Sequence, residues 1–237
     1  MHEEARVLEA LRAEVLEANL ELVRRGLVIY TFGNASGISR PDGLVVIKPS
    51  GVPYEKMTAA DMVIANLEGR VVEGPLRPST DIETHLALYR AFPSIGGVAH
   101  THSRHATAWA QACREIPCFG TTHADYFHGP IPVTAPLTPD EIESGYEANT
   151  GLAIVHALEG HGPLGCPAVL VAGHAPFCWG KSVADAAHTA VIVEELAAMA
   201  WQTLAINPAA QPISEALRDR HHFRKHGPKA TYGQQIG

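Results

Sequence analysis

The chain has 237 residues, 46% of them hydrophobic and 18% charged, which is typical of a globular protein with one or two domains. Its 18 Lys and Arg against 25 Asp and Glu give a net charge of −7, and no basic stripe is present, so a nucleic-acid partner is not expected. The sequence has no run of about 18 consecutive apolar residues, the length that a membrane span requires. Histidine is abundant, with 14 residues, but composition alone does not say what the imidazoles do.

The amino-terminal segment is acidic at its start and has the period of a helix, without the basic and apolar regions of a signal peptide. The four cysteines form no C-x-x-C pair and are not densely spaced, which argues against a disulfide framework and against a cysteine zinc site. We therefore expect a reduced, cytoplasmic protein.

The first helix is predicted from apolar residues at helical spacing, and Gly26 ends it. The segment GNASG that follows predicts a polar loop. Thr80-x-x-Glu83 predicts a capping box and a helix to about Ala91, and Ser182 with Asp185 predicts the start of a long Ala-rich helix. Short strands are expected at 44–47, 62–67, 71–72, 97–102, 168–172 and 177–179.

Further helices are expected over 103–113, near 141–159 and in the basic tail, whereas residues 116–139 predict strands and loops. The long Ala-rich helix should end at about Trp201. No internal repeat, low-complexity segment or linker-like change of composition is present in the sequence. One α/β domain over residues 1–237 is the simplest interpretation.

The sharpest motif is His100-Thr101-His102, at the end of a predicted strand. Side chains at positions i and i+2 of a strand point to the same face, so the two imidazoles can bind one ion together. Such a pair suits zinc, but two histidines near a strand end can equally well hydrogen-bond locally or face solvent. The pair alone leaves both interpretations open.

Two further residues are candidates for the same ion. His174 follows an apolar predicted strand and lies where sites collect in α/β sheets, although a single histidine there is more often a turn residue. Asp81 begins a predicted helix, where the helix dipole favours a carboxylate without any function. Three imidazoles and one carboxylate together fit Zn²⁺, with Mn²⁺ or Co²⁺ as tolerable substitutes. Such an ion acts as a Lewis acid on hydroxyl and carbonyl oxygens.

Several segments carry groups that suit an anion, namely glycine-loop amides, hydroxyls, a helix N-terminus and one ammonium group. They are Gly33, Asn34, Lys48, Ser50, Gly51, Ser79 and Thr80. Each one alone is more often an ordinary turn or cap residue, so their role depends on whether they converge in space. Asp125 and Tyr232 offer a carboxylate and a phenol as acid and base, provided that the terminal segment is held in place.

Long blocks of the sequence are more specific than any of these motifs. They are GNAS at 33–36, VIKPSGVPYEKMTAADMV at 46–63, YRAFPSIGGVAHTHSRHATAWAQA at 89–112, GTTHADYFHGPIP at 120–132, HAPFCWGKSVADAAHTAVIVEELA at 174–197 and RKHGPKATYGQ at 224–234. Together they resemble the class II aldolase/adducin family, and within it the L-ribulose-5-phosphate 4-epimerases. The resemblance extends over nearly the whole chain.

The resemblance implies a three-layer α/β/α fold around a central, largely antiparallel sheet, in C4 homotetramers whose active sites lie between neighbouring subunits. By position in the matching motifs, zinc would be bound by Asp81, His100, His102 and His174. The anion-binding candidates would line the sugar-phosphate substrate and its phosphate. Asp125 would be an acid or base from the adjacent subunit, and Tyr232 the second proton donor or acceptor.

The implied reaction interconverts L-ribulose 5-phosphate and D-xylulose 5-phosphate. Because the hydrogen on C4 is not acidic, the C3–C4 bond would break in a retro-aldol step to give a dihydroxyacetone enediolate and glycolaldehyde phosphate. The aldehyde would rotate before the bond re-forms, and zinc would stabilise the enediolate charge.

Two alternatives remain at this point. The first is a class II sugar-phosphate aldolase, although Asp81 stands where the fuculose-phosphate-type aldolases carry a glutamate base, which favours an epimerase. The second is a non-catalytic interaction module like the adducin head. The presence of all three histidines argues against that module, because adducin-type heads lack the metal ligands.

Overall fold

One antiparallel sheet forms the centre of the molecule. The computed structural model describes residues 2–226 and Ala230. Within that part the strands are β1 (Asn34–Ser39), β2 (Leu44–Ile47), β3 (Val63–Asn66), β4 (Val71–Glu73), β5 (Gly97–His100), β6 (Ala168–Leu170) and β7 (Pro176–Gly180). They lie in the order β4-β3-β2-β1-β5-β7-β6, and each neighbouring pair is antiparallel.

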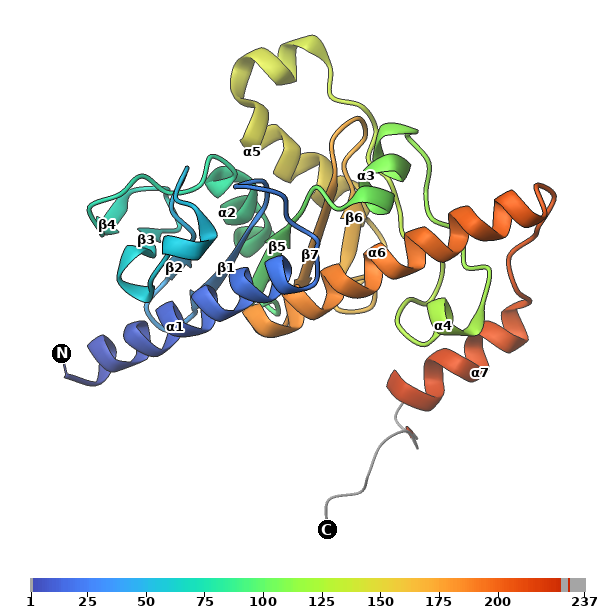
Figure 1. The fold of residues 1–237 in the computed structure, drawn as a ribbon, viewed down its shortest axis with the longest axis horizontal. Coiled ribbons are helices and arrows are strands. Elements are labelled where there is room, and N and C mark those ends of the chain that lie inside the picture. Colours follow the sequence, from blue (N-terminus) through green and yellow to red (C-terminus); the bar gives the residue numbers. More distant parts are fainter. Residues whose placement is uncertain (1, 227–229, 231–237) are drawn as a thin grey trace.

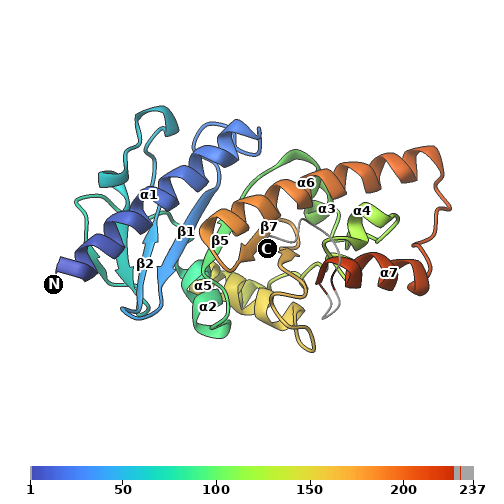
Figure 2. The ribbon, with the colours of Figure 1, turned by 90° about the horizontal axis from the view of Figure 1, so that it is seen from below.

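Helices cover both faces of this sheet. Figure 2 shows α1 (His2–Arg24) and α6 (Val183–Ile206) on one face, with α2 (Ile82–Ala91) and α5 (Pro139–Ala157) on the other. The predicted three-layer α/β/α fold around an antiparallel sheet is thus confirmed. The remaining helices are α3 (Arg104–Gln111), α4 (Thr121–Ala124), α7 (Glu215–His226) and the short 3₁₀ helices Tyr54–Lys56 and Ala59–Asp61.

The strand β1 lies in the middle of the sheet, so the polar loop predicted for GNASG is wrong. Most of its residues are small because helices approach both of its faces closely. On one face, a Cβ on Gly37 would lie 2.8 Å from Leu11 Cδ1. On the other, the Ser36 hydroxyl lies 2.7 Å from His85 Nδ1 and 2.8 Å from Tyr89 Oη. Close packing, rather than apolar content, therefore explains the residues of this strand.

The two predicted capping boxes have different outcomes. Ser182 and Asp185 form theirs, since the Asp185 amide donates to Ser182 Oγ at 3.1 Å and the Ser182 amide donates to Asp185 Oδ2 at 3.1 Å. The box predicted for Thr80 and Glu83 is wrong, because Asp81 is the N-cap residue of α2 and its side chain makes no cap hydrogen bond. The Asp81 carboxylate is engaged elsewhere, as described below.

The helix α6 runs to Ile206, five residues beyond the predicted end. By length and composition alone it would pass for a membrane span, a property that core helices of soluble proteins share. It packs against β5 and β7, and its first turn lies against these strands, with Val183 beside Gly97 and Asp185 beside Gly180. Figure 1 shows its second half extending beyond the sheet toward α4 and α7, and Trp201 there is 57% exposed. The short helix α4 lies where only strands and loops are predicted.

Candidate metal centre and active site

Three of the predicted ligands meet where β5 ends and β7 begins. His100 is the last residue of β5, His102 follows two residues later, and His174 lies in the turn between β6 and β7. Because His100 pairs with Phe177 across the two strands, that turn lies beside the end of β5. The Phe177 ring also stacks on the His100 ring with 4.1 Å between centroids. The ligand nitrogens of the three histidines, termed the triad below, all lie within 4.8 Å of one another.

Hydrogen bonds orient two of these rings. His100 Nδ1 lies 3.0 Å from the carbonyl oxygen of Pro176, which can only accept, so this nitrogen carries the proton. His100 Nε2 is left with its lone pair, 3.1 Å from His102 Nε2. Two ring nitrogens this close need a shared proton or a shared cation between them. His174 Nδ1 lies 3.1 Å from the Tyr146 hydroxyl, the kind of outer contact that orients a metal ligand.

Burial keeps the triad neutral. It lowers the pKa of His100 to about 3 and holds the pKa of His102 and of His174 below the ordinary value. The nearby Asp81 carboxylate acts in the opposite direction on all three but does not outweigh burial. At neutral pH each imidazole therefore offers a lone pair, as a metal ligand must. The residues present fit a divalent cation.

Asp81 lies beside the triad without belonging to the set of mutually close ligand atoms. Its Oδ2 accepts a hydrogen bond from Asn34 Nδ2 at 2.6 Å, and Asn34 is paired with His100 across β1 and β5. Burial would raise the pKa of Asp81, but its electrostatic interaction with the His100 and His85 rings and the Asn34 hydrogen bond hold it below its ordinary value. The structure thus keeps a carboxylate charge next to the imidazoles, and a ligand role for Asp81 stays a prediction.

The predicted anion-binding residues lie on adjoining segments near the triad. The Ser79 amide donates to the Lys48 carbonyl oxygen, and the Ser50 amide donates to that of Arg77, both at 2.9 Å. The Asn34 side chain also donates to Ser79 Oγ, at 3.0 Å. Lys48 is buried, which lowers the pKa of its ammonium group. The exposed members of the group are Ser50, Gly51 and Thr80.

Gly33 lies where the chain enters β1 beside β5. Its φ of +91° favours glycine, and a Cβ there would lie 2.7 Å from the His100 carbonyl oxygen. The Gly33 carbonyl oxygen accepts a hydrogen bond from the Tyr54 hydroxyl at 2.8 Å. A larger residue at this position would displace the backbone that carries the first histidine of the triad.

Asp125 lies at the carboxyl end of α4, which packs against α7, and Figure 1 shows these two helices away from the strands β5 and β7 beside which the triad lies. Its carboxylate accepts hydrogen bonds from Arg224 at 2.8–3.2 Å and from His221 at 3.1 Å, and Lys225 Nζ lies 3.5 Å away. Burial would raise the pKa of Asp125, but these basic groups hold it below its ordinary value. Among the described side chains no hydrogen bond joins Asp125 to the triad, and Tyr232 lies outside the described residues.

Sequence reasoning missed Tyr146 as a neighbour of the triad. The helix α5 changes direction at Gly145, whose φ is +150°, and this change presents the next residue to His174. A glycine inside a helical pattern is the only hint of this in the sequence. The His123 ring has a structural role. It is buried, and its Nε2 lies 2.8 Å from the Gly129 carbonyl oxygen.

Comparison with known proteins gives close relatives. The chain matches the model of the Class II Aldolase and Adducin N-terminal domain over residues 13–201. It is 54% identical over 228 residues to the L-ribulose-5-phosphate 4-epimerase UlaF of Salmonella paratyphi B, covering 96% of this chain and 100% of the relative. The protein of the same description from Salmonella typhi is equally similar, at 54% identity over 228 residues.

Solved structures share the fold at lower sequence identity. An L-fuculose 1-phosphate aldolase has a TM-score of 0.77 at 22% identity, covering 94% of this chain and 97% of the aldolase. YgbL of Klebsiella pneumoniae has a TM-score of 0.71 at 25% identity, covering 91% of this chain and 99% of YgbL. The family model spans most of the sequence and the curated relatives nearly all of it, which confirms the resemblance of the sequence blocks. The chain belongs to the class II aldolase and adducin family.

Proposed function

We propose that the chain is an epimerase that interconverts L-ribulose 5-phosphate and D-xylulose 5-phosphate. The observation that carries this proposal is the triad of neutral, converging imidazoles in a chain 54% identical to relatives described as that epimerase. A non-catalytic module like the adducin head has no use for such a triad. The aldolase alternative is supported by the likeness to an L-fuculose 1-phosphate aldolase structure that is 22% identical, and such a likeness supports the fold alone.

The chemistry of the substrate explains why a metal centre is needed. The hydrogen on C4 lies next to a hydroxyl and not to a carbonyl group, so it is not acidic enough to remove directly. Breaking the C3–C4 bond instead places negative charge on an enediolate that includes the C2 oxygen. A divalent ion, when bound, supplies the Lewis acid that stabilises charge on substrate oxygens. Rotation of the glycolaldehyde phosphate and re-formation of the bond then invert C4.

The proposed ion is Zn²⁺, with Mn²⁺ or Co²⁺ as substitutes, because three imidazoles and a carboxylate suit these metals. The triad and Asp81 would hold it. The hydroxyls and amides of the two adjoining loops, with the ammonium group of Lys48, would bind the phosphate group. A held phosphate keeps the glycolaldehyde phosphate in place while its aldehyde group turns.

Asp125 and Tyr232 are the proposed groups that move the proton of the C4 hydroxyl. Because Asp125 lies apart from the triad of its own chain, a complete site needs the Asp125 of a neighbouring subunit. Sharing of this kind agrees with the C4 homotetramer that the family resemblance implies, with active sites between subunits. We expect this assembly in the cytoplasm.

Incubation of the metal-loaded protein with L-ribulose 5-phosphate tests the proposal. D-xylulose 5-phosphate should form, and a His100→Asn protein should form none. The same preparation should not condense dihydroxyacetone phosphate with an aldehyde, as an aldolase would. Condensation without epimerisation would favour the aldolase over the epimerase. If the metal-loaded protein catalyses neither reaction, both proposals are refuted.

A further inference from the structure

The first turn of α3 is held by a carboxylate from α6. Glu194 Oε1 accepts a hydrogen bond from the His105 amide at 2.9 Å, and Oε2 accepts one from the Ala106 amide at 2.9 Å. His105 Nδ1 lies 2.8 Å from the same Oε1. The Glu194 side chain is only 13% exposed, so these contacts are largely shielded from water.

The Glu194 carboxylate takes the place of the N-terminal cap that α3 lacks. Ser103 is the N-cap residue of α3, and its side chain makes no cap hydrogen bond. The first amides of a helix have no partner within the helix, and negative charge is favoured beside them. Burial would raise the pKa of Glu194, but the amides of Ala106 and His105 hold it below its ordinary value. Glu194 is therefore ionised at neutral pH and bonded to both amides.

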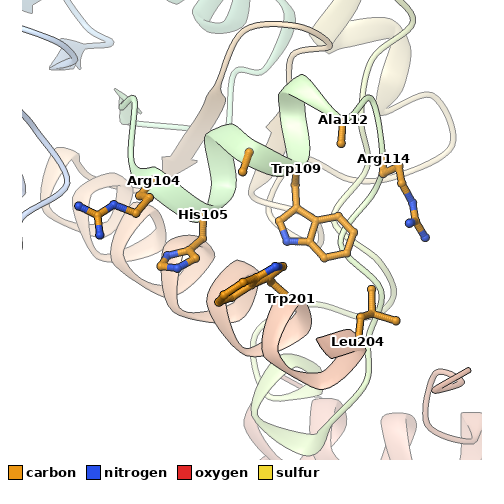
Figure 3. A pocket seen from close by; sticks show the side chains of 8 residues that line it. Arg104, His105, Trp109, Ala112, Arg114, Trp201 and Leu204 are labelled. Carbon is orange, nitrogen blue, oxygen red and sulfur yellow. The ribbon is translucent and has the colours of Figure 1, made fainter. Parts of the chain in front are cut away.

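The same face of α6 holds α3 at two further points. The indole nitrogen of Trp109 donates to the Ala197 carbonyl oxygen at 3.0 Å, and the His105 ring lies 6.0 Å from the Trp201 ring. Figure 3 shows His105 and Trp109 on α3 facing Trp201 on α6, where they line a pocket of about 400 Å³. The position of α3 is thus set by α6, and Glu194 makes the contacts nearest to the triad in sequence.

His102 belongs to the three-residue link between β5 and α3. The sheet fixes one end of this link, where His100 pairs with Asn34 and with Phe177. Glu194 fixes the other end through the first turn of α3. Because the link is short, the direction of the His102 ring depends on both ends. Release of the α3 end would let His102 Nε2 leave its position 3.1 Å from His100 Nε2.

We propose that Glu194 is a positioning residue of the metal centre. It holds the first turn of α3 and so keeps the His102 ring where it can share an ion with His100 and His174. The inference rests on the proposed metal centre and deepens it. Glu194 itself touches neither the ion nor the substrate.

The test compares Glu194→Gln with Glu195→Gln, a matched control at the next, exposed position. Competition with a chromophoric chelator measures zinc affinity, and the visible spectrum of cobalt-substituted protein reports the ligand geometry. We expect Glu194→Gln to weaken zinc binding by about tenfold, as changes behind a metal ligand do, and to shift the cobalt spectrum. Glu195→Gln should match the parent in both measurements.

Melting of the metal-free proteins separates positioning from folding. A Glu194→Gln protein with parental zinc affinity and cobalt spectrum overturns the proposal, whether or not its melting temperature falls. Glu194→Ala removes every acceptor and should bind zinc no better than Glu194→Gln; tighter binding would also overturn the proposal. A parent protein that binds neither zinc nor cobalt would refute the metal centre itself. The two failures can be told apart, because failure of the metal centre is seen in the parent protein and failure of the positioning role only in the Glu194 variants.

Discussion

Replacing Gly37 with alanine should destabilise the protein, because β1 has no room for a methyl group on that face. The added Cβ would lie 2.8 Å from Leu11 Cδ1, 3.2 Å from Val15 Cγ2 and 3.6 Å from Val183 Cβ. Leu11 can move its methyl group by changing rotamer, whereas Val15 is stiff at χ1. Overpacking of this kind costs about 1–3 kcal/mol of unfolding free energy. Replacing glycine by alanine also lowers the conformational entropy of the unfolded chain, which offsets about 0.4–1 kcal/mol of that cost.

The expected net loss is about 1–2 kcal/mol of unfolding free energy, which lowers the melting temperature of a chain of this size by about 2–8 °C. Thermal unfolding of the metal-free protein measures it. Gly162→Ala is the matched control, since nothing lies within 4 Å of its Cβ position, and it should leave the melting temperature unchanged or slightly raised. A Gly37→Ala protein that melts at or above the parental temperature would refute the close packing of β1 beneath α1 and α6.

Three further changes test the site and its surroundings. Tyr146→Phe removes the hydroxyl 3.1 Å from His174 Nδ1 and should weaken zinc binding about 2- to 12-fold, the equivalent of one hydrogen bond; unchanged affinity in chelator competition would argue against that contact. Burial lowers the pKa of His123 to about 4, so between about pH 6.5 and 4 the unfolded chain binds a proton there that the folded chain does not. The unfolding free energy should therefore fall as the pH drops through this window, by up to about 3 kcal/mol for this group, and urea titrations at pH 7 and 5 should show a smaller fall for His123→Gln. Asp125→Asn should lower epimerase turnover about 100- to 10,000-fold with zinc content unchanged. If the proposed site is shared between subunits, mixing inactive Asp125→Asn and His100→Asn proteins should restore activity, because some sites would then combine an intact triad with an intact Asp125.

The triad could be predicted because its residues carry local patterns. His100 and His102 have the spacing that places two side chains on one face of a strand, and His174 follows an apolar strand. Their convergence could not be predicted from these patterns, since it depends on the pairing of β7 with β5. Only the family resemblance indicated that the three histidines bind one ion.

Contacts between distant segments explain what the sequence patterns did not predict. The strand β1 consists mostly of small residues because helices pack closely on both of its faces, so its sequence resembles that of a loop. The Asp81 side chain fails to cap α2 because Asn34, at the start of β1, holds its carboxylate. Tyr146 and Glu194 act on residues of other elements, and neither lies in a motif that points to its partner.

The most direct test of the account measures bound metal and product in the same samples. The parent protein should hold a divalent ion and convert L-ribulose 5-phosphate to D-xylulose 5-phosphate, and a His102→Asn protein should lose both the ion and the conversion. Conversion at the parental rate by a variant that holds no metal would contradict the account, as would a metal-loaded parent that forms no product.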